Sequence, residues 1–158
     1  MRCIFEDQAE SVKGEFAIGI YRQGRLVREW SDHNLVVLSG RHRLAEMAAG
    51  KNTSHIAYIG VGSGREKEKD ADTSLTEQQL FPVTESTVTD QDARFDFVIG
   101  EDQANGLSIR EFGLFCTDET MFSHRVRIHV DEDTKEEKVL TIDKESDIEI
   151  RGYWIIHF

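Results

Sequence analysis

The chain is 158 residues long, which favours one domain over residues 1–158 and suffices for a core without disulfides. Its formal net charge is −11, and because such a surface repels a phosphate backbone, we expect no nucleic-acid binding. No apolar run approaches the ~20 residues of a membrane-spanning helix, and residues 1–7 lack the pattern of a signal peptide. We therefore expect a protein that is made in a cytoplasm and is not inserted into a membrane.

The first periodic segment predicts a β-hairpin over about residues 15–30. Apolar residues alternate from Phe16 to Ile20 and would share one strand face, and Gln-Gly at 23–24 supplies the turn. Residues 34–38 continue as a short buried strand or as an extended lead-in to the next element.

Two short helices are expected. The first covers about residues 40–49, where Ser39 can act as the N-cap and an apolar stripe follows at helical spacing. The second covers about residues 74–80, because Ser74 and Glu77 match a capping box. The only proline of the chain follows the second segment and would end it.

Most of the remaining chain alternates with period two, which predicts strands. These expected strands cover residues 55–62, 93–100, 106–117, 121–130 and 147–158, with a solvated connection at 131–138. In the segment 121–130, alternation places His124 on the apolar face and Arg127 on the other face. The sum is a mainly β protein (with a minor α component), an antiparallel β-sandwich-like domain with one or two short helices.

The strand expected at 55–62 ends in three alternating glycines, of which Gly60 and Gly62 lie within it and Gly64 lies just beyond it. A phosphate-binding loop or a dinucleotide fingerprint needs a different spacing and a helix directly afterwards. The charged residues that follow favour a glycine-permitted exit from the strand, in which glycine allows a positive φ.

No residue pattern predicts an active site, a cofactor or a metal centre. The histidines show no zinc-binding spacing, and His124 is interpreted as a hydrogen-bonded core residue. The two cysteines, Cys3 and Cys116, are interpreted as reduced thiols, with Cys116 as a small core residue. We therefore expect a protein that is not an enzyme and takes no small-molecule substrate.

Three segments together resemble the tail-fibre and tail-collar structural proteins of tailed bacteriophages and prophages, over about residues 33–126. The segments are "HNLVVLSGRHRLAEMAAG" at 33–50, "IAYIGVGSG" with "DTSL" at 56–75, and "LSIREFGLFCTDETMFSHRV" at 107–126. The resemblance assigns structural roles to Asn34, Gly40, Gly60, Gly62, Gly64, Thr73, Leu75, Arg110, Glu111 and Gly113.

The resemblance implies a non-catalytic structural or adaptor subunit of a phage tail, as a fibre, collar or baseplate component. Such a protein would be made in the bacterial cytoplasm and located in the virion tail. Tail components follow ring symmetries, so a homo-oligomer is implied, with a trimer favoured, together with docking to other tail or baseplate proteins.

Two groups of residues are candidates for the interface. Arg65, Lys67 and Lys69 lie in a charged loop that is either an interface or a plain solvated loop. Tyr153 and Ile155 lie on the less charged outer face of the last strand, which is either a contact patch or the inside of a second packed layer.

The alternative function is a carbohydrate- or host-receptor-binding β-sandwich module. It would need an exposed aromatic platform. Trp30 is the residue to examine, because alternation turns Trp154 inward.

Overall fold

The computed structural model describes residues 12–158 and shows a mainly β protein with one short helix, α1 (Leu38–Ala48). The strands of the main sheet are β1 (Lys13–Arg22), β2 (Arg25–Val36), β3 (Ile56–Gly62), β4 (Gln79–Pro82), β5 (Glu85–Thr89), β6 (Asp92–Ile99), β8 (Glu111–Cys116), β9 (Met121–Val126) and β13 (Ile148–His157). The other strands are β7 (Ser108–Ile109), β10 (Ile128–Val130), β11 (Glu137–Val139) and β12 (Ile142–Asp143). Within residues 12–158, no helix has the length and apolar character needed to cross a membrane.

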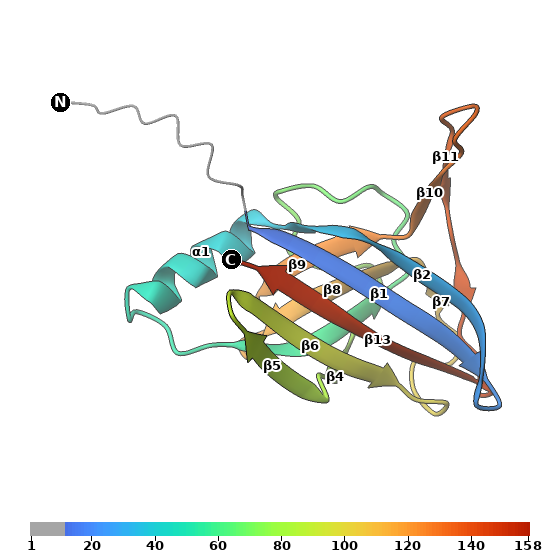
Figure 1. Ribbon diagram of the computed structural model, residues 1–158, viewed down its shortest axis with the longest axis horizontal. Helices are drawn as coiled ribbons and strands as arrows, with labels where there is room; N and C mark the ends of the chain where they lie inside the picture. The colour runs from blue at the N-terminus through green and yellow to red at the C-terminus, as the bar shows by residue number, and fades with distance from the viewer. Residues whose placement is uncertain (1–11) are drawn as a thin grey trace.

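The main sheet has nine strands in the order β4-β3-β8-β9-β2-β1-β13-β6-β5, and all neighbouring pairs are antiparallel. Its two edge strands, β4 and β5, are consecutive in the chain. Between them, the Val83 N–H donates to the carbonyl of Ala57 in β3, and the Thr84 N–H donates to the carbonyl of Asp96 in β6. The sheet is therefore strongly curled into a half-barrel (Figure 1).

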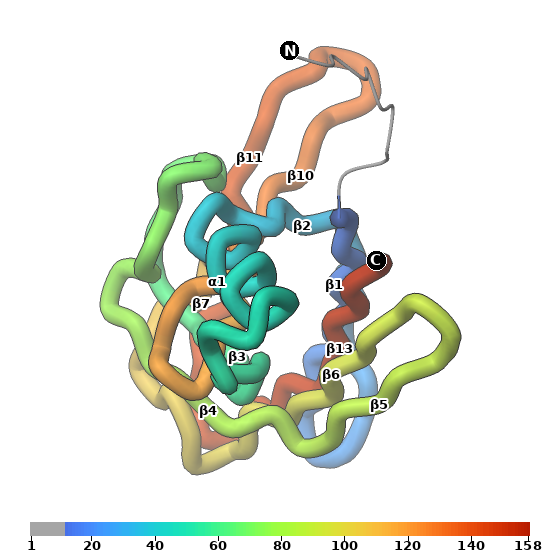
Figure 2. Tube along the Cα trace, turned by 90° about the vertical axis from the view of Figure 1, so that its left-hand side faces the viewer, coloured from blue at the N-terminus to red at the C-terminus, as the bar shows by residue number. Residues whose placement is uncertain are grey.

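The half-barrel corrects the expected sandwich. Strand β2 pairs with β1 over most of its length but with β9 only at Leu35 and Val36. The sheet turns at this narrow junction, so that its two halves face each other across the core (Figure 2). Alternation reports only which side chains point inward, and it has the same form in a sandwich and in a curled sheet.

The predicted hairpin is confirmed as β1 and β2. Both turn residues have positive φ, 52° at Gln23 and 76° at Gly24, as a type I′ turn requires. Strand β2 continues to Val36, so most of the segment expected at 34–38 is the end of this strand.

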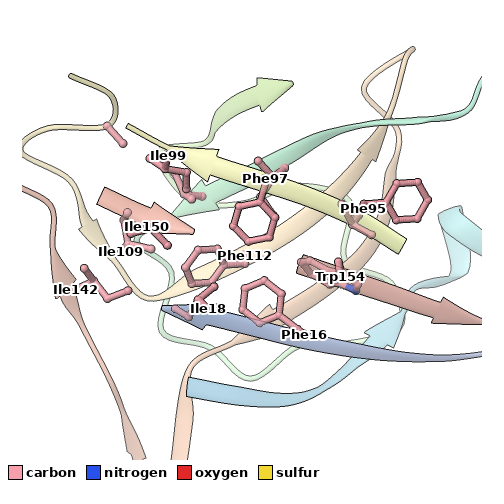
Figure 3. Close-up of a cluster of buried hydrophobic side chains, with 14 of the residues drawn as sticks. Phe16, Ile18, Phe95, Phe97, Ile99, Ile109, Phe112, Ile142, Ile150 and Trp154 are labelled. Carbon is pink, nitrogen blue, oxygen red and sulfur yellow. The ribbon is translucent and has the colours of Figure 1, made fainter. Parts of the chain in front are cut away.

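An aromatic cluster joins the two halves of the sheet (Figure 3). The ring of Phe16 on β1 lies 4.7 Å from that of Trp154 on β13 and 4.9 Å from that of Phe112 on β8, measured between centroids. The ring of Phe97 on β6, the strand beyond β13, stacks on that of Phe16. The inward parity predicted for β1, β6 and β13 is confirmed by these contacts.

Helix α1 is confirmed, but its predicted cap is wrong. The helix begins one residue before Ser39, and the Ser39 hydroxyl donates instead to the carbonyl of Met121 at 2.7 Å. The helix ends as expected before Gly50, which has a φ of 68°. Gly40 is needed for packing on β9, because a Cβ there would lie 2.2 Å from the carbonyl oxygen of Phe122.

The second predicted helix, at 74–80, is wrong. Glu77 has a φ of 52°, and its carboxylate accepts a hydrogen bond from the Ser63 hydroxyl at 2.6 Å instead of completing a capping box. The Leu75 N–H donates to the side chain of Gln78, and residues from Gln79 onward pair with β3. Pairing with β3 and burial of Leu75 outweigh the weak local preference for a helix.

The single strand expected at 121–130 is in fact two strands, β9 and β10, which belong to different sheets. They are separated by Arg127, which is fully buried and not on an exposed face. Strand β10 pairs with β11, and this hairpin projects from the body of the molecule (Figures 1 and 2). The expected connection at 131–138 is exposed, but its last two residues belong to β11.

Candidate functional site

The charged loop at residues 65–72 is held against the sheet by its acidic side chains, and we call it the anchored loop. The Glu68 carboxylate accepts hydrogen bonds from the Arg125 guanidinium at 2.6 Å and from the Val126 N–H at 3.1 Å. Asp70 accepts two hydrogen bonds from Arg41 of α1, at 2.7 and 2.9 Å. Such paired guanidinium–carboxylate contacts fix orientation as well as position.

Both ends of the anchored loop are fastened by one carboxylate, that of Glu111 on β8. Its Oε1 accepts the Gly64 N–H at 3.0 Å and the Thr76 N–H at 2.7 Å. Its Oε2 lies 2.8 Å from Nε2 of His124 on β9, and the other nitrogen of that ring lies 2.8 Å from Oδ2 of Asp72. The side chains of Glu111 and His124 are each only 4% exposed.

The histidine in this cluster carries a positive charge more readily than a free histidine. Burial lowers the pKa of His124, but hydrogen bonds and charge attraction from Glu111 and Asp72 together raise it above its ordinary value of 6.5. In the protonated ring both nitrogens donate, one to each carboxylate. When the ring is protonated, the cluster is a buried cation between two carboxylates, each of which is hydrogen-bonded to it.

This arrangement predicts how stability depends on pH. The folded-state pKa of His124 is raised, so its contribution is fully present below the unfolded value of about 6.5 and is lost as pH rises through the folded value. The difference in urea midpoint between wild type and His124→Gln should therefore shrink as pH is raised from mildly acidic to alkaline. His157 is common to both proteins and cancels in that difference. A difference that stays constant or grows with pH would contradict a charged His124.

The glycines around Glu111 are needed for close approach. A Cβ on Gly62 or Gly64 would lie 2.6 or 2.5 Å from Oε1 of Glu111. A Cβ on Gly60 or Gly113 would lie 2.5 or 2.7 Å from the ring of Phe115. The expectation that glycine supplies a positive φ at this strand exit is wrong, since the three alternating glycines are not among those with positive φ. The amide of Gly64 binds a carboxylate of the chain itself, which occupies the place of an external phosphate.

Most of the other motif residues are also used for internal structure. The Asn34 side chain accepts a hydrogen bond from the Ser123 hydroxyl at 2.8 Å. Arg110 donates to the carbonyl of Ser63 at 3.0 Å and to the Thr141 hydroxyl at 3.1 Å. Leu75 is buried, whereas Thr73 is exposed.

The two candidate interface groups lie on different surfaces. Lys67 and Lys69 are exposed to 64% and 71%, and Arg65 is exposed beside them. Glu68 and Asp72 of the anchored loop thus face inward, whereas Asp70 stays exposed in its pair with Arg41. The three cations face outward, with Lys67 near Glu137 and Lys69 near Glu66. Tyr153 and Ile155 are half-buried on β13, on the outer face of the half-barrel and away from the anchored loop.

The two tryptophans do not form an exposed platform. Trp154 is fully buried, as predicted. Trp30 is half-buried, with its ring edge-on to Phe16 at 5.7 Å and the guanidinium of Arg127 at 5.3 Å over its face.

The predicted core role of Cys116 is confirmed, because the thiol is buried, and burial raises its pKa to about 11. A thiol held in that protonated form is a poor nucleophile. Cys3 lies outside the described residues. In the part of the chain that the structure describes, His, Cys, Asp and Glu side chains form no group that could hold a metal ion.

The sequence predicted that His124 is a hydrogen-bonded core residue but did not predict its partners. The prediction of a hydrogen-bonded core histidine is confirmed by its contacts with Asp72 and Glu111. A usable signal was the alternation of Glu68, Asp70 and Asp72, which places three carboxylates at every second position of one loop.

No family model, no curated protein and no solved structure matches the chain.

Proposed function

We propose that the protein is a non-catalytic structural and docking subunit of a phage or prophage tail, as a fibre, collar or baseplate component. The observation that carries this proposal is the anchored loop, which is fastened at Glu68, Asp70 and Asp72 and exposes Arg65, Lys67 and Lys69. The proposal rests also on the motif resemblance, whose residues serve packing and anchoring.

A fastened loop that exposes three cations on an acidic protein is suited to docking. The chain has a net charge of −11, so its other surfaces, and those of further copies, are predominantly acidic. Opposite charges across an interface steer association and select the partner. Because the loop is already ordered, docking does not require the further entropy loss of ordering it.

The buried cluster of His124, Glu111 and Asp72 supports a structural role over a catalytic one. Both ring nitrogens and the two oxygens of Glu111 have partners within the chain. A group that is buried and already satisfied stabilises the fold, whereas a catalytic group must reach its substrate.

The proposed partners are further copies of the chain, most simply in a trimer, and other tail or baseplate proteins. A contact between the exposed cations of one copy and a different, acidic surface of the next is heterologous, and such contacts form a ring when the rotation between copies closes. The proposed location is the virion tail, after synthesis in the bacterial cytoplasm.

Neutralising the outward cations should weaken assembly. The variant with Arg65→Gln, Lys67→Gln and Lys69→Gln should sediment as a smaller species than wild type at equal concentration, and the assembly of wild type should weaken with added salt. The fold should be retained, because the fastening groups are unchanged.

A variant of equal charge provides the control. Arg25→Gln, Lys51→Gln and Lys135→Gln remove three exposed cations elsewhere and should leave the sedimentation of the protein unchanged. Equal assembly of both triple variants and wild type would mean that the anchored loop is a plain solvated loop.

A further inference from the structure

A groove runs along the outer face of the half-barrel, over strand β1. Small residues occupy the outward positions of β1 at Ala17 and Gly19, whereas longer side chains lie opposite them at Tyr153 and Arg151 on β13 and at Glu29 on β2. A hollow of about 780 Å³ lies over these small residues. A second hollow of about 390 Å³ continues it and shares Ala17, Ser31 and Tyr153 with the first. We call this the outer groove, and its principal lining residues are Ala17, Gly19, Tyr21, Ser31, Arg151 and Tyr153.

The shape of the outer groove suits an extended ligand. Its lining runs along β1 from Glu15 to Tyr21, a span of roughly 20 Å at the usual rise of a strand. The flanking strands β2 and β13 are two sheet spacings apart, about 10 Å. A groove of these proportions accommodates one linear chain lying along the strand direction.

Two aromatic rings of the outer groove are held in place by guanidinium groups. Arg94 lies 4.1 Å from the ring centroid of Tyr153, and Arg151 lies 4.4 Å from that of Tyr21. Each arginine is fixed in turn by a carboxylate on its own strand. Arg94 donates to Asp96 at 3.0 and 3.1 Å, and Arg151 donates to Glu149 at 3.1 and 3.2 Å. Ring faces and hydrogen-bonding edges are therefore pre-positioned, which lowers the entropy cost of binding.

The outer groove has no excess of positive charge, because its two arginines are outnumbered by the carboxylates of Glu15, Glu29, Asp32 and Asp96. Each of its arginines is matched by a carboxylate, although the protein as a whole carries −11. A polyanion would meet the carboxylates of Asp96 and Glu29 and gain no excess of positive charge in return. The lining therefore disfavours an anionic ligand, and an uncharged ligand that offers both donors and acceptors fits it.

The backbone of the groove floor argues against an extended peptide as the ligand. Strand β1 pairs with β2 on one side and with β13 on the other, so its N–H and C=O groups are used within the sheet. An extended peptide normally binds by adding its backbone to a free strand edge. A ligand here must be recognised by side chains alone, through hydroxyl, carboxylate and guanidinium groups and aromatic faces.

We propose that the outer groove binds a linear, neutral oligosaccharide. Its hydroxyl groups match the alternating donors and acceptors, and its apolar ring faces match the fixed tyrosines. The proposal gives Tyr153 a ligand-binding role in place of a subunit contact, and it departs from the expectation that the protein takes no small-molecule substrate. It does not depend on the anchored loop, which lies elsewhere on the protein.

The test begins with wild-type protein on a printed array of linear neutral and acidic oligosaccharides, followed by NMR titration with the strongest neutral binder. Tyr153→Ala removes a fixed ring, and Ala17→Leu fills the groove floor while leaving every polar group in place. Each should weaken binding by at least ~tenfold, a loss of about 1.4 kcal/mol. Val98→Ala, on the outer face of β6 but outside the lining, should bind as wild type does.

The outcomes separate this proposal from the docking function. The outer groove is supported as the binding site if wild type and the triple variant at Arg65, Lys67 and Lys69 both bind a neutral oligosaccharide. Both groove variants must at the same time lose that binding. An array that retains no glycan, or only acidic glycans, overturns the proposal. So does normal binding by both groove variants, or a change in sedimentation caused by Tyr153→Ala, which would place a second copy in the groove.

Discussion

Replacing Glu111 with alanine should lower the free energy of unfolding by about 3–5 kcal/mol, the usual cost of breaking a buried charge pair. The carboxylate is 4% exposed, and its loss leaves the His124 imidazolium with one partner fewer. It also leaves the amides of Gly64 and Thr76 without their acceptor. Because both ends of the anchored loop lose an attachment together, urea unfolding should detect a change of this size.

The matched control removes a carboxylate of the anchored loop itself that has no buried partner. The side chain of Glu66 is 91% exposed, so Glu66→Ala should change the unfolding free energy by less than about 0.5 kcal/mol. Hydrogen exchange at Gly64 and Thr76 should accelerate in Glu111→Ala and stay unchanged in the control. Equal stability of the two variants would mean that Glu111 does not fasten the loop.

Replacing Arg127 with methionine should raise stability by about 1–3 kcal/mol, the cost of an unsatisfied buried polar group. Arg127 is 0% exposed, and none of its three side-chain nitrogens has a hydrogen-bond partner among residues 12–158. Burial, together with the nearby charge of Arg28, lowers its pKa to about 10. The stacking of its guanidinium on Trp30 offsets only part of this cost.

A conservative variant separates charge from packing at this position. Arg127→Lys keeps a buried cation but loses the flat guanidinium over Trp30, so it should be less stable than wild type. Thermal unfolding of the three proteins at neutral pH should give the order methionine, arginine, lysine. A methionine variant less stable than wild type would show that the guanidinium has a stabilising partner.

The strand content of the fold could be predicted from the sequence because alternation is a local property. The hairpin at β1 and β2 and the inward faces of β6 and β13 follow from period two and the Gln-Gly turn. Curling into a half-barrel could not be predicted, since it depends on a junction of two residue pairs between β2 and β9. Such contacts between residues far apart in the sequence decide whether the strands form one curled sheet or two packed sheets.

The second helix shows how a local signal loses to distant partners. Ser74 and Glu77 have the spacing of a capping box, but the Thr76 amide is taken by Glu111, 35 residues away in the sequence. Leu75 is buried beside Phe115, and the next residues pair with β3. A capping box contributes about 1 kcal/mol, which is less than burial of a leucine and a strand pairing together contribute.

The candidate site was predictable in its parts but not in its assembly. The three glycines and Glu111 were each assigned to a motif, but the sequence gives no sign that the carboxylate fills the space left by the glycines. His124 and Asp72 are 52 residues apart in the chain, and only the fold brings them within 2.8 Å. The charged loop, which the sequence left open as an interface or a plain solvated loop, is a loop fastened to the rest of the fold that exposes three cations.

The central claim is that the fastened loop serves assembly, and the molar mass of the purified wild-type protein tests it most directly. Light scattering over a range of concentrations and at low salt should give a mass that rises to a multiple of 18.1 kDa, with three copies favoured. The triple variant at Arg65, Lys67 and Lys69 should give a smaller mass under the same conditions. A mass of one chain at every concentration, for wild type and variant alike, would contradict self-association through the anchored loop.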